Sequence, residues 1–131
     1  MKKKETTTII WFTGVISKYD ISKYDILHLE INDVALLYML STYKADRYIA
    51  VITVYNEMEK EQYIKLIRDK GLDDKLIFVF MNYDNNPVDL VAKLVQIYDV
   101  NYYIDCSRKR LKDLVPLVPP EKLIHVSQLL N

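Results

Sequence analysis

Short apolar runs alternate with longer segments of mixed polarity along this chain, and the alternation predicts its elements. The apolar runs predict a first strand that begins near Thr6 and ends at Thr13-Gly14, and further strands at 47–55, 75–81, 101–106 and 122–126. The longer segments between them predict helices. Strands that alternate with helices favour a mostly parallel sheet with helices on both faces. We therefore expect one three-layer α/β domain over residues 1–131, without a second domain or a linker.

Polar residues mark where the predicted helices begin. Side chains of Asn and Ser accept hydrogen bonds from the first backbone N–H groups of a helix. Four residues stand at such positions: Asn32, Asn56, Asn86 and Ser107. Glu59 follows Asn56 by three residues and predicts a capping box. Pro87 suits the first helical position, and Gly71 suits the left-handed position after a helix end.

The segment between the first strand and the first helix predicts a hairpin arm over 15–31. Its unit ISKYD occurs twice in tandem within 16–25. A shift of five residues exchanges the two faces of a strand, so the two copies cannot line one face of the same strand. The following ILHLEI, residues 26–31, alternates between apolar and polar positions and predicts a half-buried strand.

Charge balance, the single cysteine and the short apolar runs argue against several classes of function. The chain carries 18 basic and 18 acidic residues, and a balanced charge argues against a general nucleic-acid binder. Cys106 is the single cysteine, so an intrachain disulfide is excluded and a reducing compartment is expected. The apolar run after Met1-Lys-Lys-Lys is short and lacks a small-residue cleavage site, and no apolar run spans a bilayer. We expect a cytoplasmic protein that does not contact a membrane.

Candidate site residues follow the predicted strands, because ligands of parallel α/β sheets bind beyond the carboxyl ends of the strands. The binding candidates are Thr13, Gly14, Thr53, Asn56, Asp105, Ser107 and Arg108. Arg108 and Arg110 stand at a predicted helix start and suggest a small anionic ligand. The same basic residues could lower the pKa of Cys106, although neither His28 nor His125 is placed by the sequence as its base.

The first strand has two family resemblances. IIWFTG looks like the start of the phosphate loop of adenylylsulfate kinases, but the second glycine and the Gly-Lys-Ser/Thr of a phosphate loop do not follow. WFTGVI, residues 11–16, resembles the first motif of the haloacid dehalogenase (HAD) superfamily of phosphatases. That motif reads Asp-x-Asp-Gly-(Thr/Val), and Trp11 and Thr13 stand in its two Asp places.

Later segments extend the HAD resemblance to the 3-deoxy-D-manno-octulosonate 8-phosphate phosphatase branch. Residues 27–56 are similar to its second region, with Asn32-Asp33 in the place of Asp-Gly and Thr53 in that of the phosphate-binding Ser/Thr. YYIDCSRKRLKDL resembles the fourth motif, with Asp105 present and Cys106 replacing its partner acid. The resemblance implies a HAD-type Rossmann-like fold with a hairpin arm and no cap domain. It also implies a homo-oligomer through that arm, with a tetramer favoured over a dimer.

The departures from the motifs predict lost catalysis. Trp11 cannot attack phosphorus, Thr13 cannot act as a carboxylic acid, and covalent phosphoryl transfer needs its nucleophile. Asp105 alone is a weak metal candidate, and Lys93 lies two turns beyond the expected place of the third-motif lysine. We therefore expect a non-catalytic HAD-like protein without a metal or cofactor, acting by binding or assembly.

Two alternatives stay open. One is a Mg²⁺-dependent HAD phosphatase acting on a small phosphorylated substrate, with Glu30 and Asn32 of LEINDV in the Asp-x-Asp places. The other is a flavodoxin-like or receiver-like interaction domain, although WFTG lacks the paired acids of a receiver.

Overall fold

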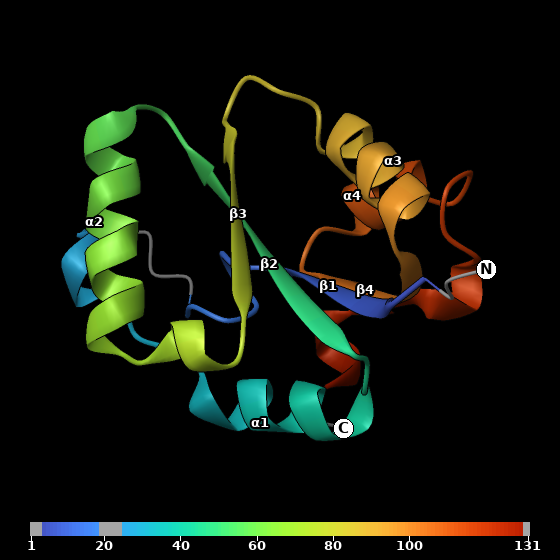
Figure 1. The fold of residues 1–131 in the computed structure, drawn as a ribbon, viewed down its shortest axis with the longest axis horizontal. Helices are drawn as coiled ribbons and strands as arrows, with labels where there is room; N and C mark the ends of the chain where they lie inside the picture. Colours follow the sequence, from blue (N-terminus) through green and yellow to red (C-terminus); the bar gives the residue numbers. More distant parts are fainter. Residues whose placement is uncertain (1–3, 19–24, 130–131) are drawn as a thin grey trace.

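The computed structural model describes residues 4–18 and 25–129 of the chain. Within them, five parallel strands form one sheet in the order β3-β2-β1-β4-β5 (Figure 1). The strands are β1 (Thr6–Trp11), β2 (Arg47–Val54), β3 (Ile77–Asn82), β4 (Asp99–Asp105) and β5 (Leu123–His125). The helices are α1 (Asp33–Thr42), α2 (Glu57–Asp69), α3 (Pro87–Ile97) and α4 (Arg108–Asp113). The predicted α/β class with a parallel, Rossmann-like sheet is confirmed.

The order of the strands reverses beside β1. The chain runs outward from β1 through β2 to β3, then crosses back to β4 on the other side of β1. The loops after β1 and β4 therefore diverge to opposite sides, and such a switch point leaves a crevice at the carboxyl ends of the strands.

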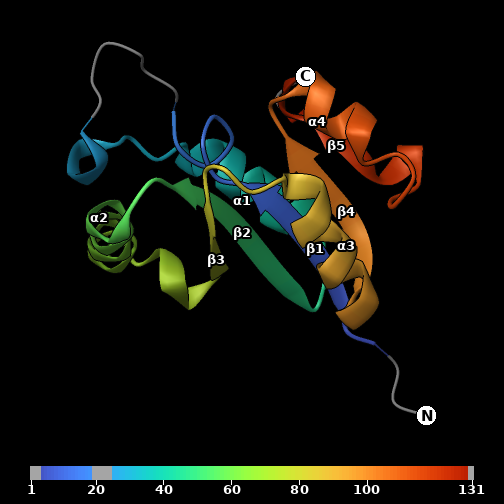
Figure 2. The same ribbon diagram turned by 90° about the horizontal axis from the view of Figure 1, so that it is seen from above.

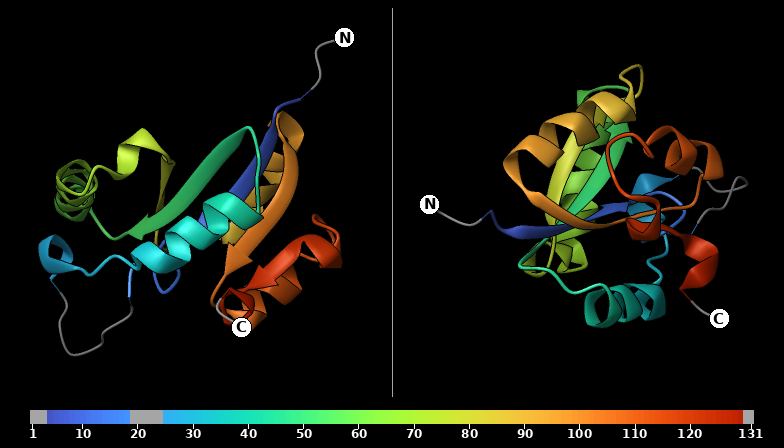
Figure 3. Two further views of the ribbon diagram at one scale, coloured as in Figure 1. Left: turned by 90° about the horizontal axis from the view of Figure 1, so that it is seen from below. Right: turned by 90° about the vertical axis from the view of Figure 1, so that its right-hand side faces the viewer.

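Helices cover both faces of this sheet. Seen from above, α3 lies in front of the sheet (Figure 2), and seen from below, α1 lies in front of it (Figure 3). β1 runs between these layers, and its Ile9 and Ile10 have no exposed surface. A strand buried on both faces needs apolar side chains on both, which explains its continuous apolar run.

The predicted helix starts are confirmed by their hydrogen bonds. The side chains of Asn32, Asn56, Asn86 and Ser107 each accept from a backbone N–H in the first turn of the following helix. The capping box at Asn56 is altered, because Glu59 accepts from the N–H of Tyr55 at 2.9 Å. Gly71 follows α2 with φ +67°, the left-handed conformation that favours glycine.

The boundaries of three predicted strands need correction. β1 ends at Trp11, two residues before the predicted end at Thr13-Gly14, because the Phe12 carbonyl accepts from the N–H groups of Val15, Ile16 and Ser17 and turns the chain. β3 begins at Ile77, since Leu72–Asp74 form a 3₁₀ turn before it. β4 begins at Asp99, two residues earlier than predicted.

The strand predicted at 26–31 is wrong. Ile26–His28 form a 3₁₀ turn, η1, whose first residues are capped by the Asp25 carboxylate accepting from the Leu27 N–H at 3.1 Å. Ile26 is buried in the core and Leu29 packs against it. A local cap therefore competes successfully with strand pairing in a segment that offers one short apolar stripe.

The described part of the arm folds back over its own domain. Its base is antiparallel, with the Lys18 N–H donating to the Glu30 carbonyl at 2.9 Å and the Asn32 N–H to that of Ile16 at 2.7 Å. Beyond this base, η1 packs against α2 (Figure 1). Residues 19–24 of the tandem repeat lie outside the described residues.

No helix within 4–18 and 25–129 combines the length and the apolar character needed to cross a bilayer.

We predict that Ile26→Ala lowers the free energy of unfolding by about 2–4 kcal/mol, because Ile26 is 5% exposed and its truncation leaves a cavity. Leu27→Ala is the control, and we expect a loss below about 1 kcal/mol since Leu27 is 38% exposed. Urea denaturation at two protein concentrations measures both losses. A loss that grows at low protein concentration would contradict this packing, because Ile26 would then lie in a subunit interface.

Candidate functional site

A cleft of about 460 Å³ lies at the carboxyl ends of the strands, beside the switch point. The ends of β1 and β2 contribute Trp11 and Thr53, and the loop after β3 contributes Tyr83, Asn85 and Asn86. The cap and body of α4 contribute Ser107, Lys109, Arg110 and Asp113. Its size falls within the range of about 300–1,000 Å³ common for small-molecule sites.

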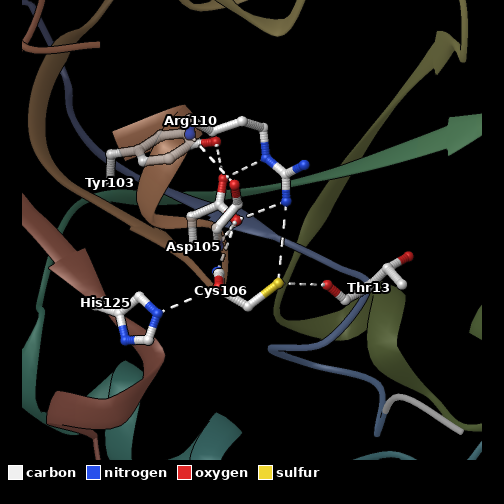
Figure 4. Close-up of polar contacts among 7 residues, drawn as sticks. Thr13, Tyr103, Asp105, Cys106, Arg110 and His125 are labelled. Carbon is white, nitrogen blue, oxygen red and sulfur yellow. Dashed lines mark hydrogen bonds and ion pairs between the residues drawn. The ribbon is translucent and has the colours of Figure 1, made fainter. Parts of the chain in front are cut away.

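Asp105, the last residue of β4, organises the wall of this cleft. Its carboxylate has no exposed surface, and both oxygens accept hydrogen bonds. The donors are Tyr103 Oη (2.7 Å), Cys106 N (2.6 Å), Ser107 N (3.0 Å), Arg110 Nε (2.9 Å) and Arg110 Nη2 (2.8 Å) (Figure 4). A buried carboxylate is tolerated when it is paired and hydrogen-bonded in this way.

The pair between Asp105 and Arg110 is bidentate, the strongest geometry for an arginine and a carboxylate. Burial lowers the pKa of Arg110, but the hydrogen bond and the charge of Asp105 outweigh it and raise that pKa above its ordinary value. The Arg110 side chain is 30% exposed, so one edge of a permanently charged group faces out of the pair.

Trp11 holds the guanidinium from another side. Arg110 Cζ lies 4.0 Å from the centroid of the indole, a cation–π contact. Figure 4 shows one terminal nitrogen of Arg110 pointing away from Asp105 and Cys106. This nitrogen, Nη1, makes no hydrogen bond within the described part of the chain, and Arg110 lines the cleft. The side chain thus presents a fixed, uncommitted donor edge.

Cys106 joins the turn after β1 to the end of β4. Its thiol donates to the Thr13 carbonyl at 3.4 Å. Gly14 has φ +84°, and a Cβ on it would lie 2.8 Å from the Cys106 sulfur. Both the backbone conformation and the close approach require glycine at this position.

The expectation of a lowered pKa for Cys106 is wrong. Burial, followed by the negative charge of Asp105, raises the pKa of this thiol despite the opposing effect of Arg110. His125 supplies no base, because its Nε2 lies 3.2 Å from the Cys106 carbonyl oxygen and its Nδ1 accepts from the Ser127 N–H at 3.1 Å. A protonated, half-buried thiol is a poor nucleophile.

The structure brings most of the sequence candidates to one place. Thr53 and Ser107 line the cleft, and Asp105 lies beneath Arg110. Thr13 and Gly14 contact Cys106, the residue after Asp105, and are not among the lining residues.

Two binding candidates lie elsewhere. The exposed Asn56 uses its side chain to cap α2, and the exposed Arg108 is not among the residues that line the cleft. Arg110, two residues further along α4, points inward instead, because positions two apart on a helix do not share a face.

Tyr83 lies in segment 82–85, at a predicted strand end where ligands are expected, but neither Tyr83 nor Lys109 was named as a binding candidate. Tyr83 directly follows a strand end, a signal that was available, whereas Lys109 looked like part of a solvated charge run. Asn86 was assigned only its helix-capping role, and it has that role as well as a place in the cleft.

No protein-family model, curated protein or solved structure matches this chain. Within the described ranges, no group of three or more His, Cys, Asp or Glu residues is arranged to hold a metal ion.

We predict that Gly14→Ala destabilises the fold by about 2–4 kcal/mol, through left-handed backbone strain and overlap with the Cys106 sulfur. Gly71→Ala is the control, since it has the same strain and nothing within 4 Å of the added Cβ; we expect about 1 kcal/mol. In a Cys106→Ala background the cost of Gly14→Ala should fall toward that of Gly71→Ala. Thermal or urea unfolding measures this cycle, and an unchanged cost would show that the contact does not matter.

We predict that stability falls as pH rises above about 10 and that Tyr103 contributes to the fall. Burial, then the charge of Asp105, raises the pKa of Tyr103 well above its ordinary value. The folded state keeps a proton that the unfolded state releases, so stability drops by up to about 1.4 kcal/mol per pH unit for this group. Tyr103→Phe should flatten the fall, whereas Tyr83→Phe, at an exposed position, should retain it. Urea unfolding from pH 7 to about 11 measures the slopes, and equal slopes would contradict the assignment.

Proposed function

We propose that this protein is a non-catalytic relative of HAD-type phosphatases whose cleft binds a small anionic ligand. The observation that carries the proposal is the fixed guanidinium of Arg110. Two of its nitrogens are committed to Asp105, its face lies on Trp11, and its Nη1 edge remains for a ligand. An arginine held in this way loses little side-chain entropy on binding a carboxylate or phosphate oxygen.

The surroundings of Asp105 favour binding over catalysis. In the resembled family, the acid of the fourth motif helps to hold Mg²⁺. Here both oxygens of Asp105 accept from protein donors, and a cation, Arg110, already lies against them. We infer that the guanidinium takes the place of the metal and meets the ligand's negative charge directly.

The first strand supports the same reading. Trp11, in the place of the nucleophilic Asp, lines the cleft and stacks with Arg110. The Thr13 carbonyl accepts from the Cys106 thiol, so this residue serves the packing of two loops. The strand end thus retains a ligand-facing position while it lacks a group that could attack phosphorus.

The alternative phosphatase frame finds less support in the geometry. Glu30 pairs with Lys18 at 3.3 Å on the surface, and Asn32 caps α1. Neither residue lines the cleft, nor does Lys93 of α3. A receiver-like interaction domain agrees with the Rossmann-like class, and it differs from our proposal in requiring no ligand in the cleft.

A homo-oligomer stays a prediction. The resemblance places the contact between copies in the arm, yet Ile26 of the arm is buried in the chain's own core. Exposed apolar residues of α1, Val34 and Leu37, offer another surface for contact between copies. Light scattering on the purified protein decides the oligomeric state.

We predict saturable binding of inorganic phosphate or of small carboxylates, measured by calorimetry and by the emission of Trp11, the single tryptophan. Arg110→Gln should weaken binding by roughly 10- to 100-fold, the range for a hydrogen bond to a charged group. Arg108→Gln is the matched control, since it removes the same charge from the same helix outside the cleft. Circular dichroism checks that each variant folds, and Arg110→Lys, which keeps the charge opposite Asp105, provides a second variant. Equal losses for Arg108 and Arg110 would reduce the effect to net charge and overturn the site.

We predict no turnover of p-nitrophenyl phosphate or sugar phosphates with Mg²⁺ above the background rate, because a nucleophile is missing at Trp11. Mg²⁺ itself should not bind tightly, because a hard cation needs several free oxygen ligands. Turnover that Glu30→Gln abolishes and Thr13→Ala leaves intact would contradict this and favour the alternative frame. A stoichiometric micromolar Mg²⁺ site removed by Asp105→Ala would equally count against our proposal.

A further inference from the structure

We propose that the ligand of this cleft carries a flat aromatic ring beside its acid group, as a nucleoside monophosphate does. The inference rests on the proposed anion binding and adds the chemical class of the ligand. Its basis is an aromatic part of the lining that differs from the charged Arg110. Tyr83 lines the cleft and stacks on Tyr55. The ring centroids are 4.3 Å apart with an interplanar angle of 24°.

The two rings are exposed, which is unusual for large aromatic side chains. Tyr55 is 56% and Tyr83 55% exposed. The other aromatic pairs of the described residues are edge-to-face and pack in or against the core, among them Phe12 with Tyr63 and Tyr43 with Tyr102. The stacked pair therefore stands apart from the packing of the core, and an exposed aromatic surface at a cleft is a feature that ligands use.

The backbone holds this pair in place. Tyr55 and Tyr83 are the first residues after β2 and β3, two neighbouring strands. The Tyr83 N–H donates to the Val54 carbonyl at 2.9 Å, and the Tyr55 N–H donates to Glu59 Oε1 at 2.9 Å. Both rings thus start from fixed positions, so a ligand ring that stacks there orders little of the protein. Stacking on an aromatic wall accepts any base, because every base has a π-face.

The remaining lining groups suit the polar middle of such a ligand. The Thr53 hydroxyl and the Asn85 side-chain amide line the cleft and make no hydrogen bond within 4–18 and 25–129. Sugar hydroxyls are natural partners for one hydroxyl and one amide. Phosphate alone would leave the ring of Tyr83 unused, and a ring alone would leave the Nη1 edge of Arg110 unused.

The experiment is a calorimetric series in which three probes add the parts of the ligand one by one, and a fourth lacks the acid group. Inorganic phosphate carries the acid group, ribose 5-phosphate adds the sugar, and adenosine 5′-monophosphate adds the ring; adenosine tests the ring without the acid. Each probe is titrated into the wild-type protein and into Tyr83→Leu, which keeps apolar bulk without a π-face. Tyr83→Phe restores the ring, and Arg110→Gln and Arg108→Gln report on the acid group.

We expect the nucleotide to bind about tenfold tighter than ribose 5-phosphate, the lower end of what one stacked base contributes. Tyr83→Leu should remove that difference and Tyr83→Phe should retain it. Ribose 5-phosphate binding as tightly as the nucleotide, with Arg110 still required, would overturn the aromatic class and leave anion binding intact. Adenosine binding as tightly as its monophosphate, with no loss in Arg110→Gln, would overturn the anion site itself. If none of the probes binds, both proposals are overturned.

Discussion

The buried carboxylate of Asp105 is the constraint on which the cleft depends. It sits at the end of a central strand with no exposed surface, where an unpaired charge would be very unfavourable. The carboxylate accepts hydrogen bonds from the strand itself, from the start of α4 and from Arg110. Through these bonds one acid fixes the direction in which α4 leaves the sheet and the place of the guanidinium. The cleft is thus a consequence of satisfying a buried charge.

This arrangement bears on the anion binding that we propose for the cleft. Because Asp105 pairs with Arg110, the proposed contact with an anion depends on the direction of the Nη1 hydrogens as well as on charge. Lys109 adds a second cation to the lining and Asp113 an acid. A lining with mixed charge favours a ligand of defined shape over a diffuse polyanion, which agrees with the balanced composition of the chain.

The approach of two loops at Gly14 and Cys106 brings the first strand into the same unit. The thiol of Cys106 donates its hydrogen bond to the Thr13 carbonyl, and its raised pKa suits a packing role. The nearest imidazole, that of His125, bonds to backbone and so stiffens the turn after β5. The Cys106 thiol and the His125 imidazole, which in the sequence suggest a reactive site, therefore help to hold the structure around Arg110 in place.

The sequence by itself determined the order of elements and their starting points. Asn32, Asn86 and Ser107 cap helices because the bond from such a side chain to the next backbone N–H groups is local, and local interactions can be read from neighbouring residues. The continuous apolar runs likewise predicted a parallel sheet covered on both faces. Between Asp25 and Ile31, the alternating pattern predicted a strand, whereas the local cap at Asp25 gives a 3₁₀ turn.

Tertiary structure decided which polar residues meet. Arg108 and Arg110 look equivalent in the run RKRLKDL, yet a 100° turn per residue directs the second at Asp105 and leaves the first in solvent. Burial turned the expected lowering of the Cys106 pKa into a rise, since desolvation depends on the atoms packed around a group and not on its neighbours in sequence. The stack of Tyr55 on Tyr83 arises only because β2 and β3 lie side by side, which places residues 28 positions apart at van der Waals distance.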